Sequence, residues 1–218
     1  MTEAPRTLLD RVFNRLLEAH GPQGWWPAET PFEVIVGAIL TQNAAWRNVR
    51  KCIENLKGAG LLELEAMSSA EAEDLAPLIR PSVYYNRKAV KLKAFCEHIR
   101  TRWEGDLSLF LSQEMEDLRK ELLGISGIGR ETADSIILYA AFQPSFVVDA
   151  YTHRILSRHG WAAEDSGYDE LRDYFMDRLE PDVPFYQEFH ALLDRTGHLY
   201  CKRVPLCDAC PLNGFDGK

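Results

Sequence analysis

Apolar side chains recur at a helical period through most of the chain. In TLLDRVFNRLLEAHG, residues 7–21, leucine, valine and phenylalanine return every three to four positions, so they form one stripe that Gly21 and Pro22 then end. The same period predicts helices over Trp46–Lys57, Ala70–Leu78, Asn86–Arg102, Glu114–Leu123, Arg130–Ala141, Ala150–His159, Tyr168–Arg178 and Phe185–Tyr200.

One segment is apolar nearly all round rather than on one stripe. It is PFEVIVGAIL, residues 31–40, and it begins with proline, which is favoured at the first position of a helix. A helix without a polar face is predicted to be buried at the centre of a domain. Convincing strand alternation is absent, and SFVVD, residues 145–149, is too short to build a sheet. We therefore predict an all-α fold.

Length and composition allow a proper core, in one large or two small domains. The chain has 218 residues, of which 46% are hydrophobic. The start MTEAPRTLLDRVF lacks the features of a signal peptide, and no apolar run is long enough to span a bilayer. We therefore expect a cytoplasmic protein with no membrane partner.

The charge is unevenly distributed. The net charge of −8 alone argues against a nucleic-acid partner. Between Arg80 and Arg102, however, there are seven basic residues and one acid, Glu97. This stretch could form a basic face for phosphate backbones, or it could be a solvated helix face. Charge alone leaves both interpretations open.

The segment GISGIGR, residues 124–130, predicts a compact turn between two helices. It follows a helix rather than a strand and lacks Gly-Lys-Ser/Thr, so it is neither a dinucleotide fingerprint nor a P-loop. Free amides of Gly127, Gly129 and Arg130 at a helix N-terminus would bind one phosphate. The alternative is an ordinary tight helix connection.

Several motifs, in order, resemble the helix-hairpin-helix DNA glycosylase superfamily typified by endonuclease III. LLGISGIGRETAD is similar to its hairpin, and FQPSFVVDAYTHRIL to the loop and Val-Asp pair that follow. GAILTQNAAW resembles the segment that fills the gap left by a flipped base, and YYNRKAVKL resembles a helix start of the same fold. The resemblance covers residues 25–210.

The resemblance implies two helical domains with a DNA-binding cleft between them. Residues 30–141 would form a six-helix domain with the hairpin, and residues 1–29 plus 142–218 the second domain with a C-terminal cysteine loop. The hairpin would hold a backbone phosphate of double-stranded DNA, with a monovalent cation on its carbonyls. Lys88, in YYNRKA, is expected among the DNA-binding residues. We expect a monomer associated with the nucleoid.

Asp149 is the candidate catalytic residue. Breaking an N-glycosidic bond builds positive charge on the sugar, and a fixed carboxylate can stabilise that charge and orient a water molecule. A helix N-terminus would keep Asp149 ionised. The alternative is that Asp149 only caps the helix. Bifunctional relatives have a lysine where this chain has Glu131, so we expect no Schiff-base lyase activity unless another lysine, with Lys88 the first candidate, substitutes.

Within the superfamily, the chain resembles the 3-methyladenine DNA glycosylase III branch. The motifs are Trp-Trp-Pro before the buried helix, an aromatic residue after TQNxx, RPSVYYNRKA and VVDAY. N3-alkylated adenine is cationic, so aromatic rings would bind it by stacking and cation–π attraction. The resemblance implies a base pocket of Trp25, Trp26, Pro27, Trp46 and Tyr151, with Gln42 wedged into the duplex. Ordinary core packing remains the alternative for the tryptophans.

Three of the five cysteines lie near the C-terminus, in a pattern unlike a disulfide framework. Cys201, Cys207 and Cys210 resemble the iron–sulfur loop of endonuclease III relatives, although the first spacing is one residue short and Asp216 stands where a fourth cysteine is expected. We expect a 4Fe-4S cluster with Asp216 as the uncertain fourth ligand. A vestigial loop or zinc are the alternatives.

The predicted function is monofunctional hydrolysis of alkylated purines such as 3-methyladenine in base excision repair. Two alternatives stay open. One is an endonuclease III-like glycosylase for oxidised or deaminated pyrimidines, and the other is a non-catalytic helix-hairpin-helix module that only binds DNA.

Overall fold

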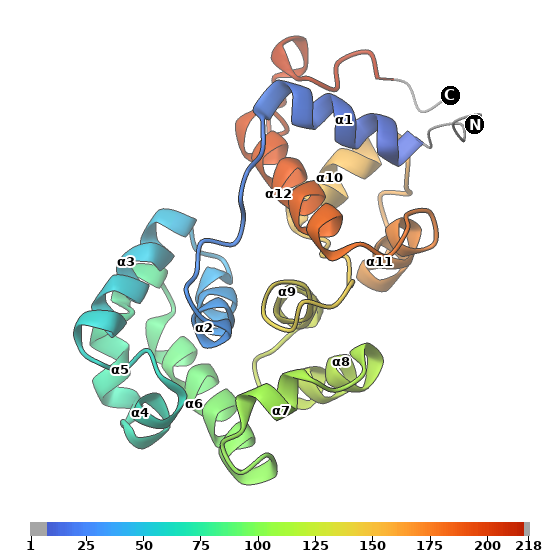
Figure 1. Ribbon diagram of the computed structural model, residues 1–218. Coiled ribbons are helices and arrows are strands. Elements are labelled where there is room, and N and C mark those ends of the chain that lie inside the picture. Colours follow the sequence, from blue (N-terminus) through green and yellow to red (C-terminus); the bar gives the residue numbers. More distant parts are fainter. Residues whose placement is uncertain (1–7, 216–218) are drawn as a thin grey trace. The chain divides into compact units, whose positions relative to one another are not determined.

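The computed structural model describes residues 8–215, and all regular structure in them is helical. The chain divides into two compact units, Met1–Pro27 with Pro144–Lys218, and Ala28–Gln143. The predicted all-α class is therefore confirmed, and the two units appear in Figure 1. No helix in the described part of the chain combines the length and the hydrophobicity that crossing a membrane requires.

The unit Ala28–Gln143 is built around α2, Pro31–Thr41. Thr30 caps this helix, because its side chain accepts a hydrogen bond of 3.1 Å from Glu33 N, and Pro31 occupies the first position. Nine of its residues are buried, and it packs against α3, α6 and α9 (Figure 1). The prediction of a buried central helix is confirmed. The other elements are α3 Trp46–Gly58, α4 Leu64–Ser69, α5 Ala72–Leu78, η1 Arg80–Ser82, α6 Tyr85–Arg102, α7 Leu107–Leu111, α8 Met115–Gly124 and α9 Arg130–Tyr139.

Two short helices of this unit, α4 and α7, were not predicted by the apolar period. They have six and five residues, so neither completes the two turns that make a stripe visible. Tertiary contacts hold them instead. Met67 of α4 and Phe110 of α7 are fully buried, and in addition α7 is capped locally, because the Asp106 side chain accepts a hydrogen bond of 2.8 Å from Leu109 N.

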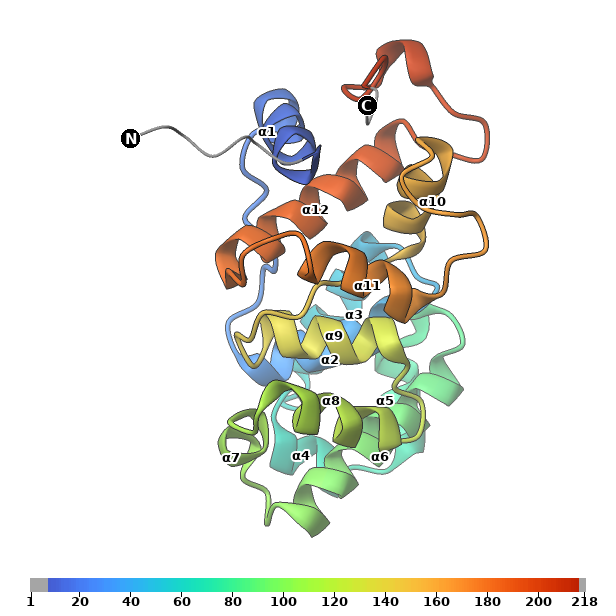
Figure 2. The ribbon, with the colours of Figure 1, turned by 90° about the vertical axis from the view of Figure 1, so that its right-hand side faces the viewer.

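The hairpin helices α8 and α9 pack against each other, and Figure 2 shows them one above the other. A bidentate ion pair joins them: Arg119 Nε lies 2.9 Å from Asp134 Oδ1, and Arg119 Nη2 lies 3.1 Å from Asp134 Oδ2. Asp134 is fully buried, so this pair fixes the two helices that present the turn.

The other unit packs α10 and α1 against α12. Its core is aromatic: Phe146 stacks on Phe175 with ring centroids 3.8 Å apart, and Phe189 meets both rings edge-on. Phe146 lies in the non-helical segment that precedes α10, and Val147 and Val148 are buried beside it. SFVVD is thus a buried connection and not a strand. The elements are α1 Leu8–His20, α10 Ala150–Arg158, α11 Tyr168–Met176, α12 Val183–Leu199 and η2 Cys207–Ala209.

Candidate active site and DNA-contact residues

Asp149 is the N-cap of α10, and the residue is 9% exposed. Its backbone is extended, with φ −89° and ψ 178°, and its Oδ1 accepts a hydrogen bond of 2.6 Å from Thr152 N. The buried valines before it anchor the chain, so the position of the carboxylate is fixed from both sides. Asp149 therefore is a helix cap, and the question is whether the carboxylate can also do chemistry.

The surroundings of Asp149 favour the ionised form. Burial alone would raise the pKa of Asp149, but His190 and the Thr152 amide lower it, and the net shift is downward. His190 Nε2 lies 3.7 Å from Asp149 Oδ2, an ion-pair distance when the imidazole is protonated. The partial positive charge at the N-terminus of α10 acts in the same direction. Asp149 is thus a buried, fixed negative charge at neutral pH.

Tyr151, two residues after Asp149, packs tightly against α12. A Cβ added at Gly197 would collide with the Tyr151 side chain, so glycine is required there for α10 to approach α12. The Tyr151 ring meets His198 edge-on with centroids 6.3 Å apart, and the Arg154 guanidinium lies 5.4 Å from its centre. The Tyr151 side chain, two residues after Asp149, is therefore held in place by contacts with residues of α10 and α12.

Two further residues near Asp149 were missed by sequence reasoning. His190 and Asp194 of α12 both interact electrostatically with Asp149. They lie four residues apart in FHALLDRTG, which places them on one face of the helix. The spacing alone could have predicted that these two residues share one face of a helix. It could not have predicted that this helix, α12, packs against α10.

The hairpin turn is the predicted phosphate site, and this role stays a prediction. Gly127 has φ +92°, a left-handed conformation that favours glycine, and a Cβ there would collide with the Lys91 side chain. Gly129 is the N-cap of α9 and has no side chain to offer the first amides of the helix, the first of which belongs to Arg130. Ile128 N donates to Ile125 O at 3.1 Å and closes the turn. The cation expected on the turn's carbonyls stays a prediction.

Gln42, the predicted wedge, is bound to this turn. Gln42 Nε2 donates to Gly127 O at 3.1 Å and to Thr132 Oγ1 at 2.9 Å. Lys91 Nζ donates to Gln42 Oε1, so all polar atoms of the Gln42 side chain are engaged. Insertion of Gln42 into a duplex would require these hydrogen bonds to open.

Lys88 is placed in the interior. It is 2% exposed, and its Nζ donates to Leu40 O at 2.8 Å and to Ser82 O at 2.6 Å. Burial, and to a lesser extent the charge of Lys91, lowers the pKa of Lys88 to about 8. As placed, Lys88 ties the end of α2 to the segment before α6, and a contact with DNA would require it to leave both carbonyls.

The basic stretch from Arg80 to Arg102 does not present all its charges on one face. Besides Lys88, Lys93 Nζ donates to three backbone carbonyls at the end of α4. Arg100 pairs with Glu97, with Nη2 2.7 Å from Oε1. At least three of the seven basic side chains are thus engaged by the protein itself, and net charge per segment overstates the surface available to phosphate.

The predicted pocket residues lie in both units. Trp25 and Trp26 are half-buried, with ring centroids 5.2 Å apart and planes at 52°, and Pro27 is exposed after them. Trp46 is half-buried at the first position of α3, in the unit Ala28–Gln143. The structure brings Trp25 and Trp26 together within one unit, and their role in a base pocket stays a prediction. Position 131, in the first turn of α9, is an exposed glutamate.

The C-terminal cysteines lie close to one another. Burial, and then the Cys201 and Cys207 thiols, raise the pKa of Cys210. However, no three His, Cys, Asp or Glu side chains within residues 8–215 form a metal-ligating group. Arg158 Nη1 also lies 3.4 Å from Cys201 Sγ.

Asp216, the expected fourth ligand, lies outside the described residues. As arranged, the described thiols fit neither the predicted iron–sulfur cluster nor zinc.

Arginines of α10 hold the cysteine loop instead. Arg154 Nη1 donates to Cys201 O at 2.8 Å, and Arg158 donates to Lys202 O at 2.7 Å and Arg203 O at 3.2 Å. These hydrogen bonds fix the start of the loop against the C-terminal half of α10.

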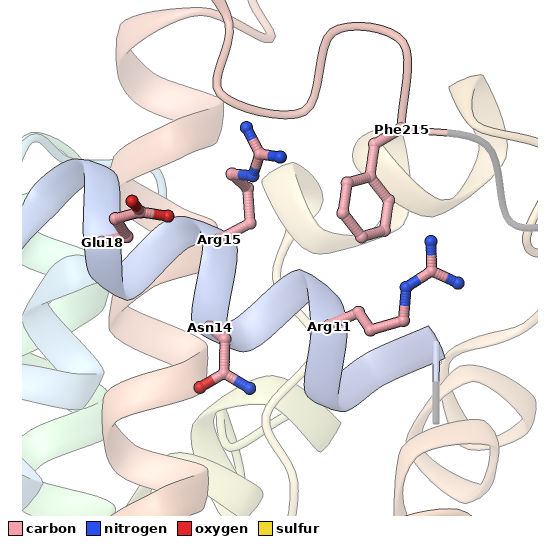
Figure 3. A pocket seen from close by; sticks show the side chains of 5 residues that line it. All are labelled: Arg11, Asn14, Arg15, Glu18 and Phe215. Carbon is pink, nitrogen blue, oxygen red and sulfur yellow. The ribbon is translucent and has the colours of Figure 1, made fainter. Parts of the chain in front are cut away.

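A shallow hollow on α1 offers no comparable chemistry. In Figure 3, Arg11 lies beside Phe215, with its guanidinium 5.1 Å from the ring centre. The other lining side chains are exposed and of mixed charge, so nothing marks a particular ligand. The lining residues are Arg11, Asn14, Arg15, Glu18 and Phe215.

Comparison with known proteins gives a consistent result. The family described as HhH-GPD superfamily base excision DNA repair protein matches residues 36–181, more than half of the chain. A Methanocaldococcus jannaschii protein, provisionally named a DNA repair glycosylase, is 43% identical over 217 residues, which are 99% of this chain and 98% of that protein. An endonuclease III of Sulfolobus acidocaldarius is 28% identical over 84% of this chain and 80% of its own length.

Solved structures agree with this. The H. pylori 3-methyladenine DNA glycosylase MagIII bound to 1,N6-ethenoadenine has a TM-score of 0.76 and 28% identity, with 88% of this chain and 98% of that chain covered. An endonuclease III trapped as a covalent intermediate with DNA has a TM-score of 0.79, with 95% of this chain and 94% of that chain covered. At 20% identity, the second likeness concerns the fold alone.

Proposed function

Because the chain belongs to the HhH-GPD superfamily of base excision DNA repair proteins, we propose that it is a monofunctional DNA glycosylase that hydrolyses the N-glycosidic bond of alkylated purines such as 3-methyladenine. The observation that carries this proposal is the Asp149 carboxylate, which is buried, held by Thr152 N and kept ionised at the start of α10. A protein that only binds DNA has no need of such a charge.

The reaction follows from what that charge can stabilise. As the bond between the base nitrogen and C1′ breaks, its electron pair leaves with the base, and positive charge develops on the sugar. The Asp149 carboxylate stabilises the sugar cation, and a water molecule adds to C1′ and gives up a proton. The products are the free base and an abasic site in an intact strand.

The choice of an alkylated purine rests on the leaving group and on the aromatic residues. An N3-alkylated adenine is already cationic, so the bond to the sugar breaks with less assistance than it would for a neutral base. Trp25 and Trp26 are half-buried neighbours that would stack on such a base. The H. pylori relative, with 28% identity, is a 3-methyladenine DNA glycosylase that was crystallised with a modified adenine.

The absence of lyase activity rests on position 131. Glu131 has no amine with which to form an imine, and Lys88 is buried on two carbonyls. We therefore expect abasic sites to remain intact until alkali or a separate endonuclease cleaves them. Borohydride should trap no covalent adduct between this protein and DNA.

The test is base release by Asp149→Asn. Single-turnover release of 3-methyladenine from methylated duplex should fall by about 10²-fold or more, the loss typical of removing one charge-stabilising group. Duplex affinity and the free energy of unfolding should stay near the wild-type values, because asparagine also caps helices well.

The matched control is Asp182→Asn. Asp182 caps α12 in the same way, accepting a hydrogen bond of 2.7 Å from Phe185 N, but it is exposed. Its substitution should leave base release unchanged. Equal turnover by wild type and Asp149→Asn on every substrate would remove Asp149 from the mechanism.

A substrate panel separates the proposal from an endonuclease III-like activity, which the 28% identity to the Sulfolobus acidocaldarius enzyme favours as the second candidate. Duplexes with an alkylated purine, an oxidised pyrimidine or a deaminated pyrimidine are scored for base release and for strand nicking. Release of pyrimidines alone would select the second candidate. Tight duplex binding with no release from any of them would leave a DNA-binding module.

A further inference from the structure

The Gln42 side chain joins the end of α2 to the hairpin turn, to α9 and to α6. Its Nε2 donates to Gly127 O at 3.1 Å, in the turn, and to Thr132 Oγ1 at 2.9 Å, in the first turn of α9. Its Oε1 accepts a hydrogen bond from Lys91 Nζ of α6. An amide side chain has an NH₂ donor group and a carbonyl acceptor, so both polar groups of Gln42 have partners in the protein.

The backbone of Gln42 is fixed, so its side chain can hold these partners in place. Gln42 is the C-cap of α2, the buried central helix, which packs against both α6 and α9. Ala44 N donates to Thr41 O at 2.9 Å and closes a turn at the end of the helix. Asn43 has a left-handed backbone, with φ +54°, so the chain changes direction directly after Gln42.

Lys91 is the charged member of this group. Its alkyl chain lies over Gly127, where it fills the space that a Cβ would need. Lys88 and Lys93 are held by backbone carbonyls, whereas the Lys91 ammonium is held by the amide oxygen of Gln42. An ammonium has three N–H donors, so Lys91 can bind a phosphate oxygen without leaving Gln42.

Holding the Lys91 ammonium before DNA arrives favours binding. A lysine side chain has a flexible four-carbon stem, so an ammonium without a fixed partner samples many positions. When its position is set in the free protein, the binding step loses less conformational entropy. The same amide cannot hold Lys91 and the turn while it also fills a gap inside a duplex, so the two roles of Gln42 can be separated.

We propose that Gln42 is a positioning residue for DNA binding, which holds the Lys91 ammonium beside the hairpin turn and keeps its hydrogen bonds when a backbone phosphate binds there. This inference rests on the proposed function, because it takes the hairpin turn as the phosphate site of a DNA glycosylase. It replaces the predicted insertion of Gln42 into the duplex. Since every duplex has the same phosphates, the contribution of Gln42 should not depend on sequence or on damage.

The experiment compares Gln42→Met and Lys91→Gln, alone and combined. Methionine has about the length of glutamine and is flexible, so it can still fill a gap in a duplex, but it cannot hold Lys91. Duplex affinity is measured from about 50 to about 200 mM salt. The slope of log affinity against log salt should fall by about 0.9 in Lys91→Gln, by more than half of that amount in Gln42→Met, and no further in the double variant than in Lys91→Gln.

Two duplexes separate positioning from insertion, one unmodified and one with a stable abasic-site analogue. Gln42→Met should lose about fivefold in affinity on both at about 0.1 M salt, most of what one released counterion supplies. A loss confined to the abasic duplex, with the wild-type salt slope, would show that Gln42 fills the gap and would overturn the proposal. An unchanged slope in Lys91→Gln, or slope changes that add in the double variant, would also overturn it.

The matched control is Gln143→Met. Gln143 Nε2 donates to Leu111 O at 3.2 Å and to Gln113 O at 2.8 Å, so it too joins separate segments of this unit, between α7 and α8. Its substitution should lower the free energy of unfolding and leave the salt slope at the wild-type value. The same slope change in Gln143→Met as in Gln42→Met would mean that general loosening of the unit lowers the affinity, and would overturn the proposal.

A second measurement needs neither DNA nor a variant that folds. In ¹⁵N NMR of the wild-type protein, the Lys91 ammonium should exchange protons with water more slowly than that of the exposed Lys51. Gln42→Met should remove the difference. Equal exchange of Lys91 and Lys51 in wild type would refute the hold on Lys91. If wild type released no base from any duplex, the proposed glycosylase activity would fail, while the salt slopes and this exchange would still decide the role of Gln42.

Discussion

The N-termini of α9 and α10 use the same physical property in opposite ways. Gly129 caps α9 without a side chain, and we propose that this helix start binds a phosphate of DNA. Asp149 caps α10 with a carboxylate that already occupies Thr152 N. Under the proposed function, the residue at the cap thus decides whether the positive end of a helix is left for a phosphate or holds a carboxylate of the protein itself.

The largest expected effect comes from opening the cap of α10. Asp149→Gly should lower base release by about 10²-fold or more, because the charge that stabilises the sugar cation is gone. The vacated amides would then resemble those of α9 and should accept formate, a carboxylate of the size removed. Added formate should raise the rate of Asp149→Gly and leave wild type unchanged. A formate-insensitive variant would show that more than the missing anion is at fault.

The converse change closes the cap of α9. Gly129 has φ −95° and ψ 178°, and a Cβ there meets nothing within 4 Å, so Gly129→Asp fits without strain. Its carboxylate would occupy the amides that we propose bind phosphate and would repel the phosphate, so duplex affinity should fall about tenfold, equally for all sequences.

The matched control for this change is Gly129→Asn, which caps the helix without a charge. It should lose part of that affinity, and the difference between the two variants measures the repulsion. Affinity titrations on two unrelated duplexes provide the data. Unchanged binding by both variants would mean that DNA does not use the start of α9.

The smallest effect concerns the lysine over the hairpin turn. The Lys91 side chain covers Gly127, and its ammonium is bound to Gln42 Oε1, whose amide nitrogen donates to Gly127 O, so this charge lies beside the proposed phosphate site. Lys91→Gln should reduce the slope of log affinity against log salt by about 0.9. Lys93→Gln is the control, because the Lys93 ammonium is bound to carbonyls at the end of α4. Equal slopes in the two variants would contradict the contact.

The hairpin could be predicted from the sequence because its determinants are local. Gly127 and Gly129 both lie within the seven-residue segment GISGIGR, and the left-handed backbone of Gly127 follows from the absence of a side chain. The long helices were equally accessible, since the stripe of each one repeats over several turns. The short helices α4 and α7 depend on packing and left no such pattern.

The site around Asp149 could be predicted only in part, because its residues are far apart in the sequence. Asp149 was found through its motif, but His190, whose Nε2 is 3.7 Å from Asp149 Oδ2, lies 41 residues further along the chain, on a helix that Gly197 lets approach α10. The basic stretch shows the same limit. Sequence counts Lys88 and Lys93 as surface charges, whereas the fold directs both towards backbone carbonyls.

The hydrogen bonds between α10 and the C-terminal loop affect how readily a protease can cleave that loop. Lys202 and Arg203 are exposed basic residues, which trypsin-like enzymes would select by side chain. Such enzymes need the peptide in an extended form with its carbonyls available, but Arg158 holds both carbonyls. Cleavage therefore requires the loop to detach from α10 first. The resistance of this segment to proteases thus depends on α10, the helix that Asp149 begins.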